Sequence, residues 1–152
     1  MIKLNRITDY AVVVLAQMAR EPDRLVTAPR LSQDSAVPLP TVSKLLKALA
    51  RARVLCSHRG VNGGYTLARA PGDISVLEIV GALEGPVALT SCVEDAEDDC
   101  SVESLCPMRG NWNKVNSAIR GALSSVSLAD MALPSMNFDP LPASASAPTP
   151  AE

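Results

Sequence analysis

The sequence contains no unbroken apolar run long enough for a membrane span or a secretory signal. The first apolar segment is closed by a cluster of charged residues: Arg20, Glu21, Asp23 and Arg24. Crossing a bilayer takes about 20 consecutive apolar residues, so we expect a cytoplasmic protein that does not bind a membrane. The chain has 152 residues, 47% of them apolar, which predicts one globular domain with an appendage.

Two catalytic patterns are also missing. Residues 60–64 are rich in glycine, but they do not connect a strand to a helix, and the P-loop lysine is absent. Both observations argue against a nucleotide-binding loop. His58 is the only histidine, and it lies next to the glycine-rich stretch, not near Cys92 or Cys106. A thiol enzyme with Cys92 or Cys106 as nucleophile would need a base beside it, and none is placed there. We therefore expect a protein that is not an enzyme.

The net charge of −2 conceals two halves of opposite sign. Residues 1–69 contain eleven Lys or Arg against four Asp or Glu, whereas residues 70–152 contain three against twelve. Neutralisation of phosphates supplies much of the affinity of nucleic-acid binders, so a basic half is typical of them. A solvated charged surface would have the same composition, and charge alone does not separate these interpretations.

The basic half has the pattern of a helix-turn-helix. Apolar residues at helical spacing predict a helix from Asn5 to Arg20, with Asn5 as its cap, and a short helix from Ala28 to Gln33. A third helix follows, with Pro40 in its first turn. One face of this helix is apolar and the opposite face is basic. The apolar positions are Val42, Leu45, Leu46 and Leu49, and the basic ones are Lys44, Lys47 and Arg51.

Residues 54–68 complete the pattern with a hairpin whose tip is rich in glycine. Two helices around a turn, followed by such a hairpin, predict a winged helix-turn-helix that places its third helix in the major groove. The wing can approach the minor groove, where Arg59 would insert or hold a phosphate. The expected DNA contacts are Thr41, Ser43, Lys44, Lys47, Arg59, Asn62 and Gly63.

The acidic half predicts two further helices. Ser75 and Glu78 form a capping box in front of an apolar helix that ends near Gly85, and residues 112–126 trace a long amphipathic helix. The same helix of a second subunit is the expected cover for its apolar stripe, although packing on its own domain is an alternative. Beyond Leu133 the sequence is rich in proline, alanine and serine and has almost no large apolar residues, which predicts a disordered tail. The expected regions are 1–70 for DNA binding, 71–133 for a ligand-binding loop, which carries three cysteines, and a dimerisation helix, and 134–152 for the tail.

Three cysteines, Cys92, Cys100 and Cys106, lie close together among acidic residues that would make a poor core. Because disulfides are uncommon in a reducing compartment, the cluster indicates metal binding or thiol chemistry. The spacing differs from that of common zinc knuckles, and it leaves an iron–sulfur cluster, zinc and a thiol switch open. Cys56, before the wing, is expected to be a packed thiol.

Several motifs together resemble the IscR/NsrR-type iron–sulfur transcription regulators over residues 1–134. They are RITDYA at 6–11, TVSKLLK at 41–47, RGVNGGY at 59–65 and the three cysteines; LEGP at 83–86, RGNW at 109–112 and SLAD at 127–130 most resemble regulators of the SUF assembly operon. The resemblance implies a homodimeric, mainly α-helical winged-helix protein with a small β-hairpin. It also implies a 2Fe–2S cluster on the three cysteines and control, expected to be repression, of cluster-assembly genes.

The resemblance leaves the fourth cluster ligand to be found. IscR-type members use a histidine three residues after the last cysteine, where this chain has Arg109, which cannot serve as a ligand. NsrR-type members use a first-helix aspartate from the other subunit, and Asp9 matches that position. Its alternative role is to stabilise the helix dipole, and Glu94 is a second candidate ligand. A regulator that responds to redox state or nitric oxide, or one based on zinc or thiols without a cluster, is the alternative function.

Overall fold

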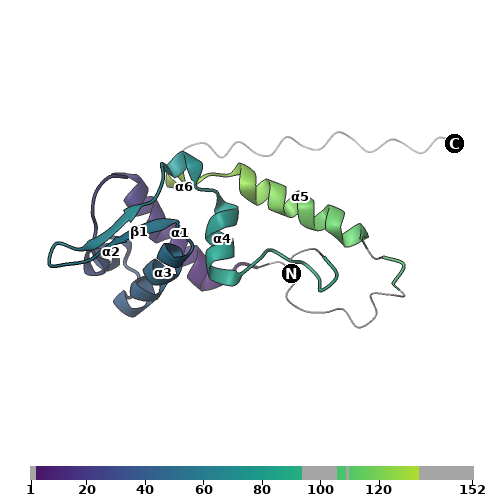
Figure 1. Cartoon of the computed structure of the whole chain (residues 1–152), viewed down its shortest axis with the longest axis horizontal. Coiled ribbons are helices and arrows are strands. Elements are labelled where there is room, and N and C mark those ends of the chain that lie inside the picture. The colour runs from purple at the N-terminus through teal and green to yellow at the C-terminus, as the bar shows by residue number, and fades with distance from the viewer. Residues whose placement is uncertain (1–2, 94–105, 109, 134–152) are drawn as a thin grey trace.

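The structure is a computed structural model that describes residues 3–93, 106–108 and 110–133. Helices and a small hairpin gather at one end of the molecule, and one helix extends away toward the other end (Figure 1). In chain order the elements are α1 (Arg6–Ala19), α2 (Ala28–Ser35), α3 (Leu39–Arg51), β1 (Leu55–His58), β2 (Gly64–Leu67), the short 3-10 helix η1 (Pro71–Asp73), α4 (Val76–Glu84), α5 (Asn111–Ser125) and α6 (Leu128–Ala132).

The first three helices form the predicted helix-turn-helix and its support. The Asn5 side chain caps α1 by accepting a hydrogen bond from the Ile7 amide at 3.2 Å. Helix α2 continues two residues beyond the predicted end at Gln33, because Ser35 donates its hydroxyl to the carbonyl of Leu31 and keeps the last turn. Ala36 then adopts the left-handed conformation, which ends α2 and turns the chain into α3.

The hydrophobic core lies between these helices and the base of the hairpin. The apolar face predicted for α3 is confirmed, since Val42, Leu45, Leu46 and Leu49 are each fully buried. On α1 the apolar residues at helical spacing face the core: Ala11, Val14, Leu15 and Met18 are buried, and Ile7 is half-buried. Leu128 of α6 joins the same cluster from the far end of the chain. The C-terminal end of the described chain therefore packs on the N-terminal helices.

The antiparallel hairpin pairs β1 with β2, from Leu55 opposite Leu67 to His58 opposite Gly64. A third segment joins it, because Val26 and Tyr65 exchange two backbone hydrogen bonds of 3.0 and 2.8 Å. The loop between α1 and α2 thus pairs with β2. Cys56 lies within β1 and is exposed, so the prediction of a packed thiol is wrong: its side chain alternates away from the buried Leu55.

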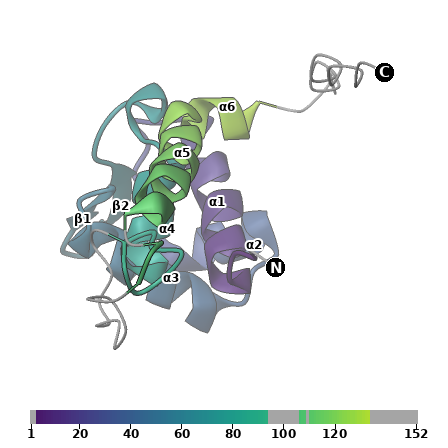
Figure 2. The ribbon, with the colours of Figure 1, turned by 90° about the vertical axis from the view of Figure 1, so that its right-hand side faces the viewer.

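Helix α4 begins at the predicted capping box and α5 packs against α4 (Figure 2). The α5 helix ends at Ser125, and a second capping box, formed by Ser127 and Asp130, starts the separate helix α6. Between α5 and α6, Val126 accepts from the amide of Val76, and the amide of Leu128 donates to Ile74 at 2.7 Å. These two backbone bonds hold the segment after α5 against the start of α4.

Among the residues that the structure describes, no helix combines the length and the apolar character needed to cross a membrane. The predicted tail at 134–152 and most of the cysteine-bearing loop, at 94–105, lie outside the described residues.

Candidate DNA-binding surface and metal centre

The outer face of α3 carries the predicted base and phosphate contacts. Lys44 and Lys47 are exposed, whereas Thr41 and Ser43 are half-buried at the edges of the helix. The core residues beneath hold this face in place, so these four side chains form one surface on one rigid element. Two ammonium groups on a firmly packed helix can neutralise phosphates while neighbouring hydroxyls reach base edges.

The tip of the wing presents Arg59 and Asn62 to solvent. Gly60 has a φ of 112°, a conformation that favours glycine, and its carbonyl accepts from the amide of Gly63 at 3.0 Å. A Cβ at Gly63 would contact the carbonyl of His58 and would lie 2.8 Å from that of Gly60. The tip is therefore a tight turn that requires glycine at these positions. Arg59 lies directly before this turn.

The base of the wing is fixed to the rest of the molecule by contacts that the sequence pattern did not indicate. Arg69, just beyond β2, lies 2.6 Å from the carboxylate of Glu78 and donates to the carbonyl of Asp73 at 3.3 Å. Burial alone would raise the pKa of Glu78, but the Ser75 amide, Arg69 and the Ser75 hydroxyl together hold it below its ordinary value of 4.5. Glu78 thereby joins the wing to the first turn of α4.

Two of the three predicted cluster ligands lie among the described residues. Cys92 and Cys106 are free, half-buried thiols, and Cys100 lies in the part of the loop outside those residues. The Thr90 hydroxyl is 3.2 Å from the sulfur of Cys92, and the neighbouring Val93 is buried. Within the described ranges no three His, Cys, Asp or Glu side chains come together, so the three-cysteine site stays a prediction. Arg109 and Glu94 also lie outside the described residues.

Asp9 lies in the first turn of α1 and is exposed. It lines an open groove of about 950 Å³ together with residues of α4 and with Met131 of α6. Behind it, the buried Thr8 donates its hydroxyl to Glu84, and the Asn5 amide donates to the same carboxylate oxygen at 2.9 Å. Glu84 is the last residue of α4, directly before the cysteine-bearing segment, so this contact joins that segment to the turn that bears Asp9.

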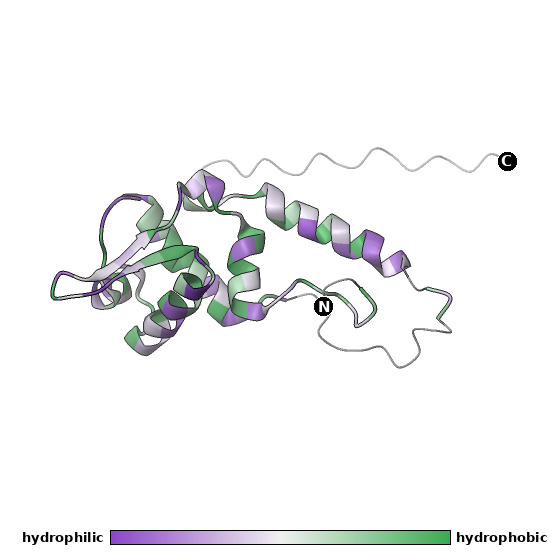
Figure 3. Cartoon of the chain, in the orientation of Figure 1, coloured by the Kyte–Doolittle hydropathy of each residue, from purple (hydrophilic) through white to green (hydrophobic). Residues whose placement is uncertain are grey.

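Helix α5 is only partly covered by its own chain. Asn116 is buried and its side-chain oxygen accepts from the amide of Leu89 at 3.2 Å, which ties α5 to the start of the cysteine-bearing segment. Trp112 and Val115 of α5 are 42% and 45% exposed, and Val126, the residue directly after the helix, is 37% exposed. Polar and apolar positions alternate along the helix (Figure 3). Packing on its own domain therefore accounts for one side of α5 and leaves a second apolar strip open.

A family model for the Rrf2 proteins, described as iron-dependent transcriptional regulators, matches residues 4–133. The chain belongs to the Rrf2 family. The HTH-type transcriptional regulator rrf2-like of Rhodobacter capsulatus is 31% identical over 130 residues, which cover 80% of this chain and 87% of that protein. The NsrR regulator of Bacillus licheniformis is 26% identical over 85% of this chain and 91% of its own length.

Solved structures support the same assignment to the Rrf2 family. The global cysteine regulator CymR of B. subtilis superposes with a TM-score of 0.66 and 25% identity, covering 87% of this chain and 97% of that one. The IscR protein of T. potens superposes with a TM-score of 0.61 and 30% identity, covering 86% and 85%. The mainly helical winged helix-turn-helix fold and the function of a DNA-binding transcriptional regulator are thereby confirmed.

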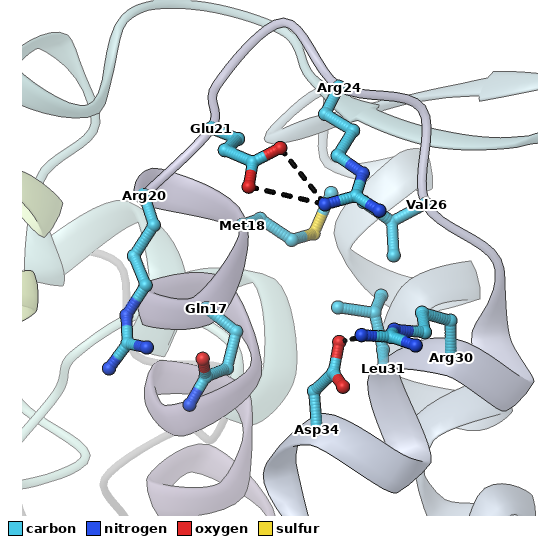
Figure 4. A pocket seen from close by; sticks show the side chains of 9 residues that line it. All are labelled: Gln17, Met18, Arg20, Glu21, Arg24, Val26, Arg30, Leu31 and Asp34. Carbon is cyan, nitrogen blue, oxygen red and sulfur yellow. Dashed lines mark hydrogen bonds and ion pairs between the residues drawn. The ribbon is translucent and has the colours of Figure 1, made fainter.

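This Rrf2 protein also has a cavity that lies apart from the predicted DNA-binding and metal-binding residues. It has a volume of about 340 Å³ and lies between the end of α1 and α2, with Met18, Leu31 and Val26 in its wall (Figure 4). The carboxylates at its rim already form ion pairs of 2.9 Å, Glu21 with Arg24 and Asp34 with Arg30. None of the predicted cysteine, Asp9 or DNA-contact residues lines it.

Proposed function

We propose that this Rrf2 protein is a repressor that senses iron–sulfur status through a 2Fe–2S cluster and controls genes of the SUF iron–sulfur assembly system. The position of the cysteine-bearing segment is the main support for this proposal. It begins where α4 ends, at Glu84, and leads into α5 at Asn111. A group bound there would lie between the DNA-binding half and the helix with the open apolar strip.

The donor set fits an iron–sulfur cluster. Thiolates are the ligands that such clusters take from proteins, and Cys92 and Cys106 are free and half-buried. Once Cys92 is a thiolate, the Thr90 hydroxyl at 3.2 Å can donate a hydrogen bond to its sulfur. Hydrogen bonds to ligand sulfur tune the potential of a cluster. When bound, the cluster would supply one-electron redox chemistry and a group that is lost under iron limitation or oxidation.

We further propose that Asp9 of the partner subunit is the fourth ligand. In this chain Asp9 is exposed on an open groove, where a second copy can reach it. A carboxylate is a harder ligand than a thiolate and binds iron in such clusters less securely. A site with three thiolates and one carboxylate would therefore release its cluster readily, as a sensor requires.

The proposed dimer forms through the open strip of α5. Trp112, Val115 and Val126 offer the apolar surface, and an isologous contact would place two copies of α3 for a palindromic operator. The signal has a continuous path within one chain. Leu89 bonds to Asn116 of α5, and the end of α5 bonds to Val76 at the start of α4, where Glu78 meets the wing. Cluster binding would fix the loop and so change the separation of the two recognition helices.

Anaerobic purification followed by visible absorption, electron paramagnetic resonance and iron and sulfide analysis tests the cluster. We expect a brown protein whose cluster is lost in Cys92→Ser and retained in Cys56→Ser, because the exposed Cys56 lies in β1. Asp9→Ala should bind the cluster but lose it faster, whereas the matched variant Asp23→Ala should behave as wild type. A colourless protein with stoichiometric zinc would instead support a cluster-free regulator.

A gel-shift comparison tests the regulatory step. Holo and cluster-free protein are compared on the same promoter duplex, and we expect their affinities to differ. Equal binding would contradict control of DNA binding by the cluster, although it would leave the cluster itself in place.

A further inference from the structure

The N-terminal tip of α3 is apolar although the rest of its outer face is polar. Pro38, Leu39 and Pro40 are all exposed, and Leu39, the first residue of the helix, keeps 41% of its surface open. The leucines further along α3 are fully buried. Leu39 therefore contributes little to the core, and its exposure needs another explanation than stability.

The tip is also poor in hydrogen-bond donors. Pro38 and Pro40 have no amide proton, and the amide of Val42 is already bonded to the carbonyl of Pro38 at 3.0 Å. A helix N-terminus normally offers several free amides to phosphates or base edges. The N-terminus of α3 has fewer free amides for such contacts, and it presents the aliphatic side chain of Leu39 instead.

The position of Leu39 decides what it can contact. The Cα–Cβ bonds of a helix tilt toward its N-terminus, so the side chain of Leu39, the first residue, lies at the N-terminal end of α3. In a helix-turn-helix the first residues of the recognition helix meet the base edges of the major groove. Lys44 and Lys47 on the exposed face favour a polyanion as the neighbour of this helix. Three apolar residues are also too small a patch for a stable protein interface, which needs roughly 800 Å² on each partner.

The thymine C5-methyl is the apolar group that the major groove displays. We propose that Leu39, held between Pro38 and Pro40, recognises a thymine methyl group in each operator half-site. This specificity contact rests on the proposed function, since it requires α3 to lie in the major groove. It adds a preference for thymine that the polar contacts of Thr41, Ser43 and the two lysines do not supply.

Replacing thymine by deoxyuridine removes only the methyl group and keeps base pairing, so it tests this contact directly. The full-length protein first selects its preferred duplex from a random library. Each thymine of one half-site is then replaced by deoxyuridine in turn, and affinity is measured by fluorescence anisotropy. For wild type we expect about a fourfold loss at one thymine, the loss that corresponds to the ~0.8 kcal/mol of one buried methyl group.

Leu39→Ala should bind the thymine and uridine duplexes equally tightly, because the side chain that contacts the methyl is gone. Its thermal unfolding should stay close to that of wild type, since Leu39 lies outside the core cluster and 41% of its surface is exposed. Lys47→Ala is the matched control on the same helix. It should weaken binding to all sequences and reduce the slope of log affinity against log salt by about 1, yet retain the uridine penalty.

A protein that binds its selected duplex with no uridine penalty, or with a penalty that persists in Leu39→Ala, overturns the Leu39 contact and leaves the proposed regulator intact. A chain that selects no duplex at all contradicts both proposals. Whether the protein selects a duplex therefore distinguishes the two failures.

Discussion

Glu78 is the residue at which the start of α4 meets the exit of the wing. Its carboxylate accepts from the amide and hydroxyl of Ser75 at the start of α4 and pairs with Arg69 at the exit of the wing. The Ser75 hydroxyl oxygen in turn accepts a hydrogen bond from the Glu78 amide at 3.2 Å. A cap that would usually serve one helix thus also fixes the orientation of the hairpin, and its effect should depend on the charge of Glu78.

We predict that Glu78→Gln removes part of the pH dependence of stability. The bonds of the folded state hold the pKa of Glu78 below its ordinary value of 4.5. A carboxylate with a depressed pKa stabilises the fold above the unfolded value, and this contribution is lost as pH falls through the folded value. The variant should therefore be less stable than wild type near pH 7, and the difference should vanish in acid, as measured by urea unfolding across pH.

Ser75→Ala serves as the comparison for this experiment. It should lower stability by about 1 kcal/mol through the lost cap. It should still retain part of the acid dependence, because Arg69 and the Ser75 amide continue to bind Glu78. A difference between wild type and Glu78→Gln that stays constant down to strong acid would contradict the assigned role.

At the scale of elements, the wing depends on a close backbone approach. A Cβ added at Gly64 would lie 2.7 Å from the carbonyl oxygen of Val26, the group that bonds to the Tyr65 amide. The loop before α2 and the strand β2 can therefore pair only where the strand lacks a side chain. This pairing fixes the wing at its base while its tip remains free to reach DNA.

Gly64→Ala should destabilise the protein by about 1–3 kcal/mol, because backbone atoms on both sides would have to shift. Gly81→Ala is the matched change: Gly81 lies inside α4, and a Cβ there would meet nothing within 4 Å. It should stabilise the helix by roughly 0.5–1 kcal/mol. Urea unfolding measures both, and equal effects of the two substitutions would refute the steric account of the wing.

Local signals predicted the elements well because their causes lie within a few residues. The Asn5 cap, the Ser75 and Glu78 box and the buried face of α3 all depend on neighbours along the chain. The Val26 and Tyr65 bridge and the Thr8 and Glu84 bond join residues far apart in sequence, and no periodicity indicates them. For the candidate site, the sequence indicated which residue types matter. It could not show that Cys56 is exposed or that Asp9 lines a groove.

At the scale of the whole molecule, α5 is the element that a single chain leaves incompletely covered. Its Asn116 faces the chain's own loop, while Val115 is exposed on the open strip with Trp112. An exposed apolar strip on an amphipathic helix marks a surface for association. Helix α5 extends away from the end of the molecule that holds α1, α2, α3 and the hairpin (Figure 1).

Val115→Glu should convert the proposed dimer into a monomer, since a buried, unpaired carboxylate at an interface is strongly unfavourable. Ser117→Glu, also exposed on α5 but offset from the Val115 strip, should leave the dimer intact. Light scattering coupled to size-exclusion chromatography reports the mass of each. Circular dichroism confirms folding, and a dimeric Val115→Glu variant would show that subunits associate through another surface.

The bridge between Ser75 and Ser127 has a consequence for how such a protein can diversify. A backbone bond joins Val76, at the start of α4, to Val126, after the end of α5. Helix α4 packs on α1 and α3 and supplies Ile79 to the core, so the segment that can vary is the loop between α4 and α5. Insertions or deletions in that loop can alter the spacing and number of candidate ligands without shifting the register of the core. One DNA-reading scaffold could in this way acquire a succession of different sensory chemistries.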